Sequence, residues 1–94
     1  MKIPKKFTLG GTTWKVPEHP ALVNTVNALG VSSNITATIQ MLSGLNPDVK
    51  EQTYCHELVH AILFSMGKPG NEHDEIFVDG FATFLHQYLK QHGN

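Results

Sequence analysis

The feature that most constrains the fold is the stretch TYCHELVHAIL, Thr53 to Leu63, in which two histidines stand four residues apart with a glutamate after the first. On an α-helix, which turns about 100° per residue, His56 and His60 lie about 40° apart on one face. Both imidazoles can therefore reach one metal ion. Glu57, rotated about 100° from His56, is placed to contact water bound to that ion. This HExxH spacing is typical of zinc sites in which the glutamate takes a proton from zinc-activated water.

The same stretch also fits an ordinary buried helix. The residues around the motif make the helix apolar over most of its circumference; they are Leu58, Val59, Ile62, Leu63 and Met66. Two histidines and a glutamate buried without a common partner would be costly to desolvate, whereas a metal ion would satisfy all three. A core helix whose histidines find other polar partners remains the alternative at this point.

The N-terminal part of the chain predicts strands. In KKFTLGGTTWKV, apolar residues alternate with polar ones on both sides of Gly10 and Gly11, which predicts a β-hairpin with Trp14 as its anchor. In SNITATIQML, Ile35, Ala37, Ile39 and Met41 share one face of a further predicted strand. Between them, residues 21–29 have helical spacing but a composition that forms helices poorly.

Two helices are predicted in the second half. The first has Asn46 as its cap and Pro47 at its first position, and runs to about Met66, where GKPG ends it. The second begins near Asn71 and carries one aromatic stripe of Phe77, Phe81, Phe84 and Tyr88. The order of elements indicates an α+β fold: an N-terminal hairpin and a further strand in a short sheet, packed on the HExxH helix and a C-terminal helix.

Composition narrows the classes of function. The 94 residues predict a single domain, and 40% hydrophobic residues with eight acids against seven basic residues fit a soluble globular protein. All seven basic residues are lysines, and without arginine we expect no nucleic acid partner. No apolar run is long enough for a membrane span or a signal core. We therefore expect a cytoplasmic protein, and the single cysteine, Cys55, which permits no internal disulfide, agrees with a reducing compartment.

A third zinc ligand is predicted downstream, because a zinc site of catalytic type uses three protein ligands and a water. If the GKPG turn folds the two helices back on each other, the rise of about 1.5 Å per residue puts Glu75 level with His60. The same arithmetic puts Asp79 near His56. Glu75 and Asp79 share a helix face, so one can bind the metal while the other accepts the second N–H of His56. His73 is the alternative third ligand.

With HELVH followed by EIFVD, the chain resembles the gluzincin metallopeptidases, and in layout the minimal ImmA/IrrE-like peptidases and small phage-encoded zincins. The resemblance spans roughly residues 35–89 and implies a zincin-like fold. It implies that His56, His60 and Glu75 bind Zn²⁺, that Glu57 is the general base, and that Asp79 is the outer carboxylate that orients His56. The gap between His60 and Glu75 is short for this clan, and DGFA matches its signature only approximately.

Further residues have weaker roles. The oxyanion-stabilising donor could be Tyr54, His73, His86 or Tyr88, none of which has a spacing argument. Cys55 falls on the apolar stripe of its helix and is interpreted as core. His86 is interpreted as a surface or half-buried histidine.

Three functions follow from these residues. The first is a zinc endopeptidase acting on an extended protein or peptide substrate added to the sheet edge, for which Ile35 to Leu42 is the candidate strand. The second is a catalytically silent, zinc-stabilised protein-interaction module. The third, a purely structural zinc site, fits less well because such sites close their shell with four cysteine or histidine ligands. Substrate and oligomeric state do not follow from the sequence.

Overall fold

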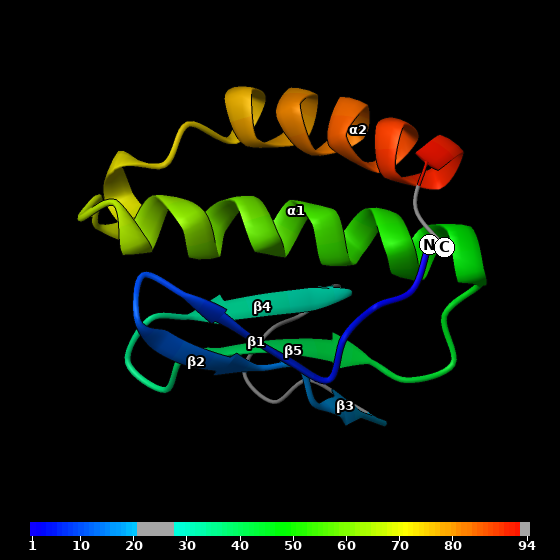
Figure 1. Ribbon diagram of the computed structural model, residues 1–94, viewed down its shortest axis with the longest axis horizontal. Helices are drawn as coiled ribbons and strands as arrows, with labels where there is room; N and C mark the ends of the chain where they lie inside the picture. Colours follow the sequence, from blue (N-terminus) through cyan, green and yellow to red (C-terminus); the bar gives the residue numbers. More distant parts are fainter. Residues whose placement is uncertain (21–27, 93–94) are drawn as a thin grey trace.

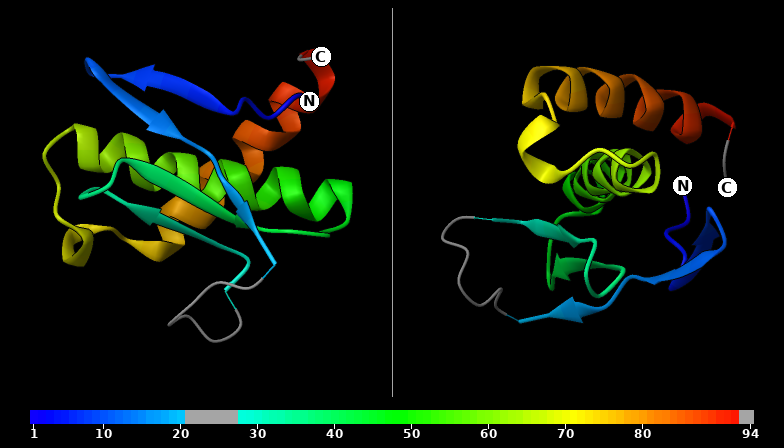
Figure 2. Two further views of the ribbon diagram at one scale, coloured as in Figure 1. Left: turned by 90° about the horizontal axis from the view of Figure 1, so that it is seen from below. Right: turned by 90° about the vertical axis from the view of Figure 1, so that its left-hand side faces the viewer.

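The computed structural model describes residues 1–20 and 28–92 and shows an α+β protein in three layers (Figure 1). A mixed sheet forms one outer layer, helix α1 (Pro47–Ser65) the middle layer, and helix α2 (Glu75–His92) the other outer layer. The right-hand view of Figure 2 shows the same stacking from the side, and the left-hand view shows α2 crossing α1 obliquely. In the described ranges, neither helix combines the length and hydropathy needed to cross a membrane.

Within the described residues, five strands form the sheet: β1 (Lys6–Leu9), β2 (Thr12–Lys15), β3 (Glu18–His19), β4 (Gly30–Ser33) and β5 (Thr38–Leu42). Strand β5 is central. It pairs in parallel with β2 and then β3 on one side, and antiparallel with β4 on the other. Strand β4 is therefore an edge strand, and its residues Gly30 and Ser32 lie against the middle of α1.

The predicted N-terminal hairpin is confirmed. Strands β1 and β2 pair antiparallel with Phe7 opposite Trp14, and the two-residue turn has positive φ at Gly10 (57°) and Gly11 (83°). These angles suit glycine, because side chains with a Cβ rarely adopt them. Trp14 is 1% exposed and anchors the hairpin in the core, as the sequence predicted.

The strand predicted over Ile35 to Met41 is wrong in its first half. Ile35 is 97% exposed and lies in the turn between β4 and β5, and Ala37 has a positive φ of 51°. Only Ile39 and Met41 of the predicted face are buried. The alternation of Ile, Thr and Ala continues through a turn whose one typical turn residue is Asn34, so the periodicity did not show the reversal. The weak helix predicted over 21–29 falls largely on residues outside the described ranges; Gly30, which follows it, begins β4.

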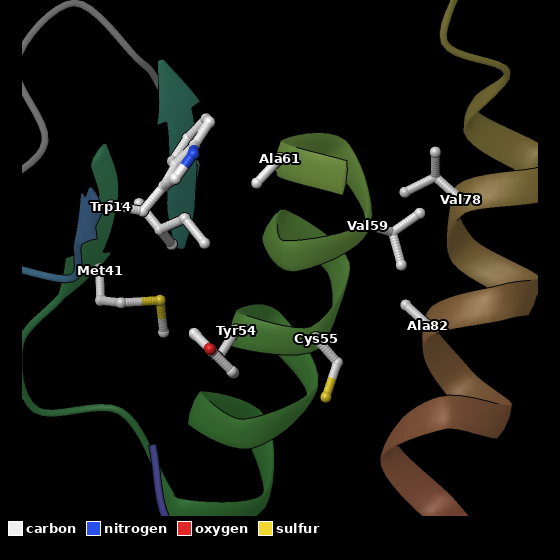
Figure 3. Packing of buried hydrophobic residues seen from close by; sticks show 9 residues of the cluster. Trp14, Met41, Tyr54, Cys55, Val59, Ala61, Val78 and Ala82 are labelled. Carbon is white, nitrogen blue, oxygen red and sulfur yellow. The ribbon is translucent and has the colours of Figure 1, made fainter. Parts of the chain in front are cut away.

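Helix α1 begins and ends as predicted. The Asn46 side chain accepts a hydrogen bond from the Asp48 N–H (2.9 Å), Pro47 is the first helical residue, and Met66 follows the last turn. The helix is central, so it packs on both sides (Figure 3). Tyr54 and Ala61 point toward the strands, and Val59 points toward α2 (Figure 3). This explains why the sequence is apolar over so much of the helix circumference.

Helix α2 begins four residues later than predicted. Residues Gly70–Glu72 form a 3₁₀ turn, and Asp74 caps α2 by accepting from the N–H groups of Ile76 (2.9 Å) and Phe77 (3.3 Å). The start predicted near Asn71 was wrong because Asn71 and Asp74 are both capping residues followed by acids, and the local sequence does not choose between them.

The aromatic stripe of α2 exists but is exposed. Phe77 and Phe81 are 50% exposed, Phe84 72% and Tyr88 60%, whereas Val78 and Ala82 are fully buried against α1. The small side chains of α2 therefore face α1, which lets the two helices approach closely.

Candidate metal centre

His56 and His60 are held on one face of α1, half-buried, with ring centroids 5.0 Å apart. Four residues separate them, so a single well-capped helix sets the distance between their rings. That face of α1 lies under the first turns of α2, because the connection between the helices is short.

Glu75, the first residue of α2, lies between the two imidazoles. Its Oε1 is 3.0 Å from Nε2 of His60, and its Oε2 is 3.3 Å from Nε2 of His56. One ligand atom from each of the three side chains can be chosen so that all lie within 4.8 Å of one another. The juxtaposition that the sequence predicted is therefore present, although Glu75 begins its helix instead of lying one turn into it.

Asp79 lies one helical turn after Glu75 and contacts the other nitrogen of His56, with Oδ1 2.7 Å from Nδ1. An ionised carboxylate only accepts hydrogen bonds, so the neutral His56 ring carries its proton on Nδ1. Its Nε2 is then a lone pair directed at the Glu75 carboxylate, which is also an acceptor. With the ring neutral, two acceptors would face each other at 3.3 Å, an arrangement that either a second proton on His56 or a metal ion would stabilise.

His60 completes the group. Burial lowers the pKa of His60 below its ordinary value, while the carboxylates of Glu57 and Glu75 oppose this shift; the net effect favours the neutral ring. Two imidazole nitrogens and a carboxylate oxygen are the donor set of a catalytic zinc site, with the fourth position left for water. The residues present therefore fit a zinc ion.

Glu57 is 8% exposed and is held by Ser32 of β4. The Ser32 hydroxyl lies 2.8 Å from Oε1 of Glu57 and 2.8 Å from the main-chain oxygen of the same residue. Both oxygens are acceptors, so the single hydroxyl proton is shared between them and one carboxylate oxygen of Glu57 remains without this contact. Ser32 could not be found from the sequence, because the docking of β4 on α1 is what brings it to the motif.

Gly30 makes that docking possible. A Cβ at position 30 would lie 2.8 Å from Cγ2 of Thr53 and 3.1 Å from Cγ of Glu57. Two small hollows open where β4 meets α1. One, of about 220 Å³, is lined by Glu57 together with His56 and Asp79, and the other, of about 250 Å³, by Glu57 together with His60 and His73. Glu57 therefore borders both hollows, beside each histidine of the motif.

The four candidate oxyanion donors are separated by the fold. Tyr54 is buried on the sheet side of α1, where burial raises its pKa to about 12. Tyr88 is 60% exposed, far along α2, and His86 bonds to Glu51 and Gln52 instead of the site. Only His73 reaches the site, where its Nδ1 lies 2.7 Å from Nδ1 of His60.

Cys55 is fully buried in the core, as the sequence predicted, and burial raises the pKa of its thiol to about 11. It takes no part in the site. Comparison with known proteins finds no significant match to any protein family, curated protein or solved structure.

Proposed function

We propose that this protein is a zinc metallopeptidase of the minimal gluzincin type that its HELVH and EIFVD motifs resemble. His56, His60 and Glu75 are the proposed ligands, Glu57 is the general base, and Asp79 orients His56. The observation that carries the proposal is the convergence of imidazole Nε2 atoms and a carboxylate, with Nε2 of His56 left as an acceptor by Asp79. A reducing compartment, the cytoplasm, is proposed from the free Cys55 thiol.

Zinc in this site would supply a polarised water with a pKa of about 7. The chain's own contribution begins with Glu57, whose Oε1 is held by Ser32. Its other carboxylate oxygen is left to accept the proton of the attacking water and then to pass it to the leaving amine. Asp79 keeps the proton of His56 on Nδ1, so that Nε2 stays available as a ligand.

The proposed substrate is an extended peptide paired with β4. The edge predicted from the sequence, Ile35 to Leu42, is wrong because β5 is paired on both sides. Among the described residues, no strand pairs with the outer edge of β4.

The register of β4 shows which of its groups are available. Residues of an antiparallel pair alternate between bonded and non-bonded positions, and the bond from Leu42 N to Leu29 O (2.9 Å) marks that pair as bonded. The main-chain N–H and C=O groups of Gly30 and Ser32 therefore point away from β5. A peptide can add to these groups as a further strand beside Glu57.

A second candidate is the catalytically silent, zinc-stabilised interaction module. The exposed aromatic side chains of α2 favour it, since large exposed apolar patches mark interaction sites. An apolar hollow of about 200 Å³ beside them is lined by Val59, Ile62, Leu63, Met66, Phe77 and Phe81.

The test combines metal analysis with cleavage of a peptide library by the purified protein. We expect wild type to hold one zinc, Glu75→Ala to lose it, and Glu57→Gln to keep it but cleave nothing. Glu72→Ala is the matched control, because Glu72 is an exposed acid in the adjacent 3₁₀ turn and makes no contact with either histidine of the motif. Zinc retained by Glu75→Ala would overturn the ligand assignment. Zinc bound without any cleavage would favour the interaction module.

A further inference from the structure

His73 connects the turn between the helices to the candidate metal centre. It follows the 3₁₀ turn Gly70–Glu72, and its ring packs beside Phe64, with centroids 4.5 Å apart. Its Nδ1 lies 2.7 Å from Nδ1 of His60, and its Nε2 lies 2.9 Å from the main-chain oxygen of Lys68. Both ring nitrogens of His73 are thus occupied, one by a metal-ligand candidate and the other by the backbone of the turn.

The contact between His60 and His73 has the geometry of a hydrogen bond. The planes of the two rings differ by 18°. The ring centroids are 5.0 Å apart and the two Nδ1 atoms 2.7 Å apart, so the centroid separation is longer by about two ring radii, as expected when the two nitrogens lie on the line between the centroids. The rings therefore meet edge to edge in nearly one plane, as an N–H···N bond requires. Two nitrogens on one tetrahedral zinc would be about 3.3 Å apart, so 2.7 Å does not suit a metal bound by both Nδ1 atoms.

The position of each proton follows from the backbone. A carbonyl oxygen only accepts, so Nε2 of His73 carries the proton that it donates to Lys68. In the neutral ring, Nδ1 of His73 is then an acceptor, and the proton between the two rings belongs to Nδ1 of His60. Nε2 of His60 is left as a lone pair, directed at the Glu75 side chain 3.0 Å away.

We propose that His73 is a positioning residue that holds the proton of His60 on Nδ1 and so reserves Nε2 of His60 for the metal. Its importance for metal binding rests on the proposed function. His73 holds a proton on Nδ1 of His60, as Asp79 does on Nδ1 of His56. The acceptor is here a neutral imidazole ring, whose other nitrogen donates to the main-chain oxygen of Lys68. It is not the alternative third ligand, because its Nδ1 is used by His60.

Two amide substitutions separate the two contacts of His73. The side-chain amide of Asn places its polar atoms where Nδ1 of histidine lies, and that of Gln places them where Nε2 lies. His73→Asn keeps an acceptor for His60, and His73→Gln keeps only the contact with Lys68. Zinc affinity is measured by chelator competition. We expect it to stay near wild type in His73→Asn and to fall about 10- to 100-fold in His73→Gln, the usual loss when an outer partner of a ligating histidine is removed.

Nitrogen-15 NMR of histidine-labelled protein supplies the readout that loss of packing alone would not give. In metal-free wild type we expect an exchange-protected imidazole proton shared by the two Nδ1 atoms. In the zinc-loaded protein we expect His60 to bind through Nε2. Equal zinc affinity of His73→Gln and wild type, zinc on His73, or no protected proton in the metal-free protein would each overturn the inference. If wild type binds no zinc, the proposed function fails, while the protected proton still decides the pairing of the rings.

Discussion

Substitution of Gly30 by alanine tests the contact between β4 and α1 most directly. The new Cβ would meet Cγ2 of Thr53 at 2.8 Å, Cγ of Glu57 at 3.1 Å and the main-chain oxygen of Gln40 at 3.3 Å. The Thr53 methyl belongs to a β-branched residue with few rotamers in a helix, Glu57 is held by Ser32, and the Gln40 oxygen is part of the backbone. None of the three neighbours can move away freely.

The expected cost follows from these contacts. Overpacking of this kind costs about 1 to 3 kcal/mol, and the smaller entropy of the unfolded alanine chain returns about 0.4 to 1 kcal/mol. We therefore expect Gly30→Ala to lower the free energy of unfolding by about 1 to 2 kcal/mol. Gly80→Ala is the matched control, because Gly80 is exposed within α2 and an added Cβ there meets nothing within 4 Å. Higher helix propensity should stabilise that variant by about 0.5 to 1 kcal/mol.

The assay is urea unfolding with excess chelator, followed by the fluorescence of the single, buried Trp14. Working without metal separates the strand contact from any effect of zinc on stability. If Gly30→Ala is as stable as wild type, or gains as much as Gly80→Ala, then β4 does not lie this close to α1. The proposed support of Glu57 by Ser32 would then fall with it.

Three further predictions concern the core and the ionisable groups. Val78→Ala, at a fully buried position, should lower the free energy of unfolding by about 2 kcal/mol. Phe84→Ala should change it by less than about 0.5 kcal/mol, because Phe84 is 72% exposed. A large loss of stability in Phe84→Ala would show that something covers the aromatic stripe. The hydrogen bond from His86 lowers the pKa of Glu51 below 4.5, so the stability that this pair contributes is present above pH 4.5 and is lost as the pH falls through the folded pKa. The free energy of unfolding of Glu51→Gln, measured with urea between pH 3 and pH 7 at roughly half-unit steps, should therefore depend less on pH than that of wild type. Because burial raises the pKa of Cys55 to about 11, iodoacetamide should label it only after unfolding, and rapid labelling of the folded protein, detected by mass spectrometry, would contradict its burial.

The parts of the fold that were predictable from the sequence depend on local chemistry. Gly10 and Gly11 provide the positive φ angles of a tight hairpin, and Asn46 with Pro47 marks the start of α1. The grouping of His56, His60, Glu75 and Asp79 followed from helix geometry and a short turn. This prediction did not depend on the residue at which α2 begins, because Glu75 and Asp79 keep their spacing of four residues on one helix face in either case.

The parts that were not predictable depend on packing between distant segments. Residues 77–89 contain two apolar faces, one of aromatic residues and one with Val78 and Ala82, and periodicity alone does not say which faces α1. The face with Val78 and Ala82 packs against α1, because Cys55 and Val59 of α1 are also small. A close approach of the two helices then buries all four side chains. Ser32 and Gly30 look ordinary in the sequence, and their roles arise only when β4 docks beside the motif.

The candidate site has two parts, one supplied by the two helices and one supplied by the sheet. All contacts among the proposed ligands and Asp79 lie within the hairpin of α1 and α2. The contact that holds Glu57 comes from Ser32, 25 residues before it, and depends on a strand that pairs with β5. A chain in which only the hairpin has formed would therefore already possess the proposed metal ligands, but not the Ser32 contact that supports the proposed base, Glu57. If the proposed function holds, metal binding and hydrolytic activity should appear at different moments during folding, as during any partial opening of the sheet.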